Sequence, residues 1–393
     1  MICFQNTQSL NGLWDFHYEE RALSDAEILS AGYAQHETVP GCFDAATSRF
    51  TRPGTAVYRK RVVCGGRVMF RVRGVTLRAK VFFEGKLLGS IPYAFTPCDF
   101  VVDNVRQGEH DLIIAVTNII DESNSSMFHE AYDFYSFGGI CRPVELRHLN
   151  ENYIQSIAVT PLHPDSGKIR VKLTLEKPAS LPLTLKIDRQ AVLVSDIAGD
   201  CAEFDCIVPA PVPWSPEQPV LHTIEAELPF DRVSTEFGLR TLSWNDGILK
   251  LNGQPLKLYG FCRHDSHPEF GYAMPEALVL KDLQMLKEAG CNFLRGSHYK
   301  QSDFLLDCCD RLGILVWEES CGWGNSAAQC ADPVFRKLQN EQTRRMVQES
   351  INHPSIILWG FMNELDSQTA EARELLSSLF ATVRAEDRSR PVT

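Results

Sequence analysis

Polar residues that could transfer protons end four short apolar runs in the C-terminal third of this 393-residue chain. The runs and the residues that follow them are Leu258 to Phe261 with His264, Asn292 to Leu294 with His298, Ile314 to Trp317 with Glu318 and Glu319, and Ile356 to Trp359 with Asn363 and Glu364. Carboxyl and imidazole groups are the usual general acids and bases of enzymes. No GxGxxG, GxxxxGK[ST] or GxSxG motif accompanies any run, so nucleotide-binding and serine-hydrolase sites are disfavoured. The pattern indicates hydrolysis by acid–base chemistry.

The elements that position these residues alternate between apolar runs and stretches with helical spacing. We expect helices around Val279 to Leu286, 303–312, 333–352 and Leu375 to Val383, with Gly290 and Gly313 ending the first two. Strands that are apolar on both faces and alternate with helices form a parallel sheet covered by helices. Either a doubly wound sheet or part of a (β/α)8 barrel fits, and in both the C-terminal ends of the strands hold the site.

The first 245 residues show the period of two that is typical of antiparallel strands. Val68, Phe70 and Val72 alternate with polar neighbours up to about residue 150, and Ile169, Val171 and Leu173 do so in the next segment. We expect one β-domain over residues 1–150, a second β-sandwich over 151–245 and the strand–helix units over 246–393.

Charge and composition exclude several classes of partner. The chain has 39 basic and 50 acidic residues, a net charge of -11, so a nucleic acid would be repelled. No basic segment with an apolar run begins the sequence, and no stretch of about 18 apolar residues occurs, which disfavours secretion and a membrane span. The 13 cysteines include no CxxC pair, so we expect reduced thiols and a cytoplasmic location.

Metal binding is disfavoured as well. His264 and His267 have a spacing that could suit a metal, but Pro268 follows directly and no helix is expected there. We therefore expect no metal ligands and no cofactor.

Short motifs occur along nearly the whole chain. They are Asn11-Gly12-Leu13-Trp14, Val39-Pro40-Gly41, Phe137-Gly138-Gly139-Ile140-Cys141-Arg142-Pro143-Val144, Phe237-Gly238-Leu239-Arg240, Leu251-Asn252-Gly253-Gln254-Pro255, Gly260-Phe261-Cys262-Arg263-His264-Asp265, Arg295-Gly296-Ser297-His298-Tyr299, and Asn352-His353-Pro354-Ser355 with Trp359 and Asn363-Glu364. Together these motifs are similar to those of glycoside hydrolase family 2, which includes β-galactosidases, β-glucuronidases and β-mannosidases. The resemblance implies a jelly-roll β-sandwich, an immunoglobulin-like β-sandwich and the first half of a (β/α)8 TIM barrel.

The resemblance also implies roles for individual residues. Glu364 would be the general acid/base, and the alternative is a solvated or salt-bridged glutamate at a strand end. Asn363 would hold the sugar 2-hydroxyl, with a turn-capping asparagine as its alternative. His298 and His264 would donate hydrogen bonds to ring hydroxyls, or be structural. Asp133 would reach into the active site from the first domain, or be an ordinary loop acid.

Several neighbours of these residues have other expected roles. For Glu318 and Glu319 we expect a structural ion pair rather than a second catalytic carboxylate. Trp317 and Trp359 lie within apolar strands and should pack in the core, whereas Trp323 is a candidate for stacking on a sugar. Arg295 suits an ion pair as well as a substrate contact.

The sequence departs from the family in ways that bear on function. Lys300 replaces a usual proline and Met362 a usual small residue, and either could change the shape of the sugar subsite. A (β/α)8 barrel needs about 250 residues, and the family's seventh-strand nucleophile has no counterpart here. We therefore expect the N-terminal portion of a longer enzyme, inactive by itself.

The parent activity implied is that of a retaining exo-β-glycosidase acting on carbohydrate, most like a β-galactosidase. A β-glucuronidase of the same family, or a non-catalytic carbohydrate-binding protein, is the alternative. The sequence leaves open whether a divalent cation assists, as in some β-galactosidase relatives. By analogy with the family, a homo-oligomer is conceivable.

Overall fold

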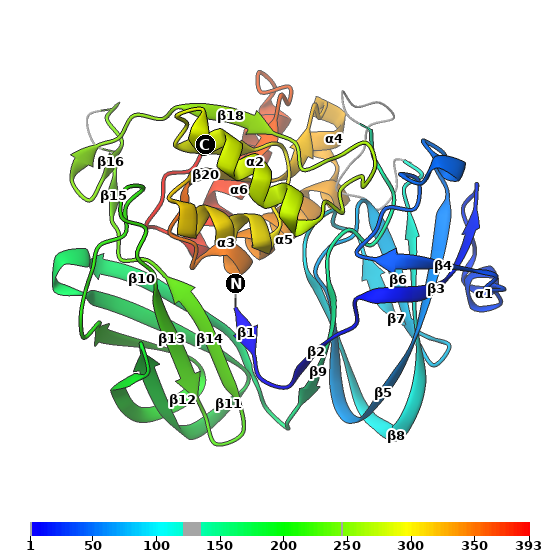
Figure 1. Ribbon diagram of the computed structural model, residues 1–393, viewed down its shortest axis with the longest axis horizontal. Coiled ribbons are helices and arrows are strands. Elements are labelled where there is room, and N and C mark those ends of the chain that lie inside the picture. Colours follow the sequence, from blue (N-terminus) through cyan, green and yellow to red (C-terminus); the bar gives the residue numbers. More distant parts are fainter. Residues whose placement is uncertain (1, 121–134, 245–246) are drawn as a thin grey trace.

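Strands from Thr7 to Leu149 form an antiparallel sheet (Figure 1). The computed structural model describes residues 2–120, 135–244 and 247–393. The long strands β5 and β8 pair along most of their length, and β5 carries the alternating residues Val68, Phe70 and Val72 into the core. The strands of this sheet are β2 (Thr7–Ser9), β3 (Gly12–Glu19), β4 (Gln35–Val39), β5 (Thr55–Val72), β6 (Arg78–Phe83), β7 (Lys86–Ile91), β8 (Cys98–Thr117) and β9 (Val144–Leu149).

A second antiparallel sheet follows, and its core is built from alternate residues such as Ile169, Val171 and Leu173. Its strands are β1 (Cys3–Phe4), β10 (Ile154–His163), β11 (Lys168–Ile187), β12 (Gln190–Ile207), β13 (His222–Glu227) and β14 (Arg232–Phe237). Strand β1 pairs with β14, so the start of the chain belongs to this sheet and not to the sheet of residues 1–150. A period of two could not reveal this, because pairing partners distant in sequence leave no local signal.

The expected parallel sheet is present, in the order β18-β19-β20-β21. Its strands are β18 (Gly260–Arg263), β19 (Phe293–Gly296), β20 (Leu315–Trp323) and β21 (Ile356–Asn363), and the short strands β15 (Leu242–Ser243), β16 (Lys250–Leu251) and β17 (Gln254–Pro255) precede it. Near the C-terminus Val392 forms a parallel bridge with Trp359, on the free side of β21.

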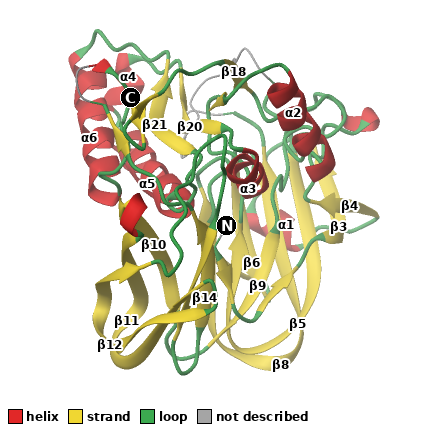
Figure 2. Cartoon of the chain, turned by 60° about the vertical axis from the view of Figure 1, so that its left-hand side comes forward, coloured by secondary structure: helices red, strands yellow, loops and turns green. Residues whose placement is uncertain are grey.

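The helices expected from sequence are confirmed. They gather around the parallel strands at the top of Figure 2, with the two antiparallel sheets below. The helices are α1 (Asp25–Leu29), α2 (Glu276–Glu288), α3 (Asp303–Leu312), α4 (Ala327–Ala331), α5 (Pro333–Ser350) and α6 (Ala370–Glu386). Helix α3 begins at its N-cap Ser302, whose side chain accepts from Leu305 N, and ends at Gly313 in the left-handed conformation.

The architecture therefore agrees with a mainly β N-terminal part and a partial barrel. The names jelly roll and immunoglobulin-like, and the division at residues 150 and 245, stay predictions. In the described part of the chain, no helix is both long and apolar enough to cross a membrane.

Two helix-ending glycines provide a matched test of this architecture. Gly313 has φ +67°, and an added Cβ would lie 2.2 Å from the carbonyl oxygen of Pro216, whereas Gly290 has φ +81° and open space around it. Gly290→Ala should cost about 1 kcal/mol of unfolding free energy, because only the left-handed backbone is strained. Gly313→Ala should cost about 3 kcal/mol, because the second sheet's Pro216 loop must also move. Urea unfolding measures both, and equal losses would contradict the close approach at Gly313.

Candidate active site

The register of the parallel sheet brings the ends of its strands to one edge. Arg263 is level with Gly296, Gly296 with Glu318, and Trp323 with Asn363. His264, His298 and Glu364 follow the strand ends closely, so residues up to 100 positions apart in sequence lie at the same edge of the sheet.

The guanidinium of Arg295 connects the polar side chains of this edge. Its Nε donates to Glu319 Oε1 at 2.6 Å and its Nη2 to Asn363 Oδ1 at 2.9 Å. The other oxygen of Glu319 lies 2.8 Å from His298 Nδ1, and because that carboxylate can only accept, Nδ1–H is the donor. The guanidinium also lies 4.4 Å from the centre of the Trp317 ring. The tautomer of His298 is thereby fixed, with Nε2 as its remaining ring nitrogen.

His264 lies next to His298, with ring centroids 5.5 Å apart in an edge-on arrangement. The ring of Tyr299 is 6.0 Å from that of His264, and the Tyr299 hydroxyl accepts from the backbone of Asp265 at 2.9 Å. The structure therefore groups His264, His298 and Asn363, as the sequence predicts, while Asp133 lies outside the described residues.

Glu364 is exposed at the end of β21, and its Oε2 accepts a hydrogen bond of 3.0 Å from the indole of Trp323. Met362 and Glu364 both adopt left-handed φ angles, +59° and +52°. Such residues cost about 1–3 kcal/mol each and cluster at functional sites. The side chain of Met362 is buried with Cys330 and Phe335, and its expected effect on the shape of the sugar subsite stays a prediction.

The two neighbouring glutamates of β20 have different environments. The ion pair expected of Glu319 is confirmed by its contact with Arg295. The same expectation is wrong for Glu318, which is fully buried and accepts from Gln301 N at 3.0 Å without an ion-pair partner within 4.0 Å among the described residues. Burial raises the pKa of Glu318 to about 7, against the opposing charge of Lys300. Successive strand residues face opposite sides, which sequence alone does not assign.

Trp359 and Trp323 also lie in different environments. Trp359 is buried, as expected, and donates to Asp387 at 2.7 Å. No local sequence pattern indicates the contact of Trp323 with Glu364, because the two residues are 41 positions apart.

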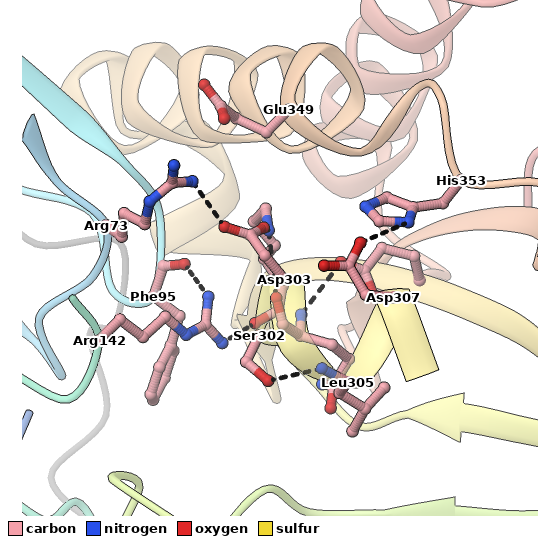
Figure 3. Close-up of polar contacts among 12 residues, drawn as sticks. Arg73, Phe95, Arg142, Ser302, Asp303, Leu305, Asp307, Glu349 and His353 are labelled. Carbon is pink, nitrogen blue, oxygen red and sulfur yellow. Dashed lines mark hydrogen bonds and ion pairs between the residues drawn. The ribbon is translucent and has the colours of Figure 1, made fainter. Parts of the chain in front are cut away.

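A polar network joins the first domain to the loop after His298. Figure 3 shows its contacts from Arg73 to Asp303 and from Arg142 to Phe95. Lys300, which is 2% exposed, donates to Asp303 at 2.9 Å, and Arg73 of the first sheet donates to the other oxygen of Asp303 at 2.8 Å. Although burial opposes ionisation, the charges of Lys300 and Arg73 hold the pKa of Asp303 well below its usual value. Arg142 joins the Phe95 and Lys300 carbonyls. The departure at Lys300 thus connects the loop to the first domain.

The motif around His353 serves the fold. Asn352 bonds the backbone of Ile157 and Val159 at 2.8 Å, and His353 Nδ1 lies 2.5 Å from Asp310 Oδ2. Asp307, Asp310 and His353 could place ligand atoms within 4.8 Å of one another. The close His353–Asp310 hydrogen bond already uses two of these groups, and the prediction of no metal stays a prediction.

Comparison with known proteins defines the class. Residues 152–240 match glycosyl hydrolases family 2, and residues 242–393 match the TIM barrel domain of that family. A solved GH2 β-galacturonidase from Eisenbergiella tayi, bound to galacturonate, is 32% identical with a TM-score of 0.89, over 98% of this chain and 70% of that one. The chain belongs to glycoside hydrolase family 2.

Curated relatives carry related activities. A β-galactosidase of Thermoanaerobacter pseudethanolicus is 30% identical over 98% of this chain and 53% of its own length. A β-glucuronidase of Streptococcus agalactiae is 26% identical over 99% of this chain and 72% of its own length. The chain thus spans about half the length of the first of these relatives.

The buried carboxyl of Glu318 gives a pH-dependent stability. Its pKa is raised from 4.5 to about 7 in the fold, so the neutral form is favoured and stability is lost as the pH rises through that interval. Glu318→Gln should therefore become more stable relative to the wild type by about 3 kcal/mol between pH 4 and pH 8. Urea unfolding across this range measures the difference, with the exposed Glu288→Gln as control. A difference independent of pH would contradict the burial of an ionisable Glu318.

Proposed function

We propose that this chain carries the sugar-binding and acid/base part of a retaining exo-β-glycosidase. The observation that carries the proposal is the exposed carboxyl of Glu364 at the strand edge, one residue from Asn363 and on the same edge as His264 and His298. A glycosidic oxygen is a poor leaving group unless it is protonated, and Glu364 can supply that proton and later accept one from water.

The neighbouring residues would hold the sugar. Asn363 would donate its amide N–H to the 2-hydroxyl, because Arg295 already occupies its Oδ1. The imidazole of His298 would present Nε2, because Nδ1 is engaged by Glu319. The side chains of Asn363 and His298 are already oriented before the sugar binds, so they need no reorganisation in the transition state.

A retaining mechanism needs a second carboxylate about 5 to 5.5 Å from the first. Glu319 is ion-paired with Arg295 and hydrogen-bonded to His298, and Glu318 is buried on the other face of the strand. We infer that neither is the nucleophile and that it comes from outside the four parallel strands described.

The preferred sugar has the galacto configuration. β-Galactosidases and a β-galacturonidase are among the relatives. The sugars in these two names share the galacto configuration and differ at carbon 6. A β-glucuronidase is the alternative, since relatives of that name also match over nearly the whole chain.

The first test concerns the source of the nucleophilic carboxylate. The 393-residue chain should give no hydrolysis of nitrophenyl β-galactoside above the rate of its Glu364→Gln variant. Reading the coding DNA past codon 393 shows whether the frame continues. Measurable turnover by this chain that is lost in Glu364→Gln would contradict the inference about the nucleophile.

The second test concerns Glu364 and uses the complete coding frame. Glu364→Ala should lower kcat by about 10²- to 10⁴-fold on alkyl β-galactosides, whose leaving groups need a proton. The glycosylation step of dinitrophenyl galactoside should be less affected, because its leaving group needs no proton. Azide should restore turnover, because as a nucleophile it needs no general base. The exposed Glu288→Ala is the control. Comparison of galactoside, galacturonide and glucuronide assigns the substrate, and full activity of Glu364→Ala would overturn the proposed role.

A further inference from the structure

Trp323 lies at the end of β20, where its indole N–H reaches the carboxyl of Glu364. The distance from Nε1 to Oε2 is 3.0 Å. An indole nitrogen can donate but cannot accept, so the direction of this hydrogen bond is fixed. The carboxyl is exposed, and Trp323 is its donor within the part of the chain that the structure describes.

The backbone determines why the indole points to this carboxyl. The register between β20 and β21 shifts between Ser320 and Trp323, so that Trp323 is level with Asn363. Gly324 N then donates to Asn363 O at 2.8 Å and fixes the two strand ends together. Such irregularities redirect a side chain relative to a regular strand.

The position of Glu364 depends on irregular backbone angles at the end of β21. Its φ of +52° and that of Met362, +59°, turn the chain at the strand end. Each conformation is unfavourable for a residue with a side chain, so contacts must retain it. The hydrogen bond from Trp323 is a contact of this kind.

We propose that Trp323 positions Glu364 and determines which of its two oxygens carries the transferable proton. Oε2 accepts from the indole whether the carboxyl is charged or neutral, because the carbonyl oxygen of a carboxylic acid is also an acceptor. The proton therefore resides on Oε1, which is the oxygen left to meet the glycosidic oxygen. The catalytic consequence rests on the proposed function, whereas the hydrogen bond itself does not.

This role differs from sugar stacking, which the position of Trp323 also suggested. A stacking residue would contribute its ring face, and phenylalanine would replace it. A positioning residue contributes its N–H, and phenylalanine would not.

The test of the contact uses indole N–H signals of the ¹⁵N-labelled 393-residue chain, which has six tryptophans. Trp323→Phe assigns one signal by its loss. In the wild type this signal should move as Glu364 ionises, and in Glu364→Gln it should remain still over the same pH range. In Glu364→Ala it should shift upfield by several line widths. Trp244→Phe, which replaces a ring 40% exposed, is the control for general effects of removing a tryptophan. A Trp323 signal that titrates unchanged in Glu364→Gln would overturn the proposal.

The catalytic arm uses the complete coding frame. Trp323→Phe should lower kcat about 10- to 100-fold on alkyl galactosides with KM nearly unchanged, because a misplaced acid loses rate without losing binding. The kcat/KM of dinitrophenyl galactoside, which reports the glycosylation step alone, should stay close to the wild-type value because its leaving group needs no proton. A rise in KM alone, or an equal loss of kcat/KM on both substrates, would overturn the positioning role. If Glu364→Ala keeps its activity while the indole signal still follows Glu364, the proposed function fails and the hydrogen bond stands.

Discussion

The side chain of Arg295 is the fixed charge on which the candidate site depends. It bonds Glu319 and Asn363 directly and, through Glu319, fixes the tautomer of His298. Because Arg295 lies on β19 and its partners Glu319 and Asn363 lie on β20 and β21, the guanidinium joins three strand ends at the same edge. Its planar fork can serve several acceptors at once, which the point charge of a lysine could not do with the same geometry.

The rest of the molecule holds that edge in place. Arg73 and Arg142 extend from the first sheet to the Lys300–Asp303 segment next to His298. Arg240, at the end of the second sheet, donates to the backbone carbonyls of Pro354 and Ile356 at the start of β21. The two β-domains therefore act as supports of the parallel strands. The buried guanidinium of Arg73 is paired with carboxylates, whereas those of Arg142 and Arg240 donate to backbone carbonyls.

Strained backbone angles occur at the end of β21, next to the proposed acid/base Glu364. The left-handed Met362 turns its side chain toward the helices, and the left-handed Glu364 leaves its carboxyl exposed beside the indole of Trp323. A regular strand would continue the alternation and could not give both orientations.

The sequence by itself determined the elements. Period-two residues such as Val68 and Phe70, helical spacing, and glycines 290 and 313 depend on neighbours within a few positions, so the strands, helices and the edge that bears His264, His298, Asn363 and Glu364 could be predicted. Only the tertiary structure decided the pairing of β1 with β14, the opposite environments of Glu318 and Glu319, the position of Met362 and the contact of Trp323 with Glu364. Each of these depends on strand register or side-chain facing between distant residues, and a shift of one position in register reverses which side chains meet.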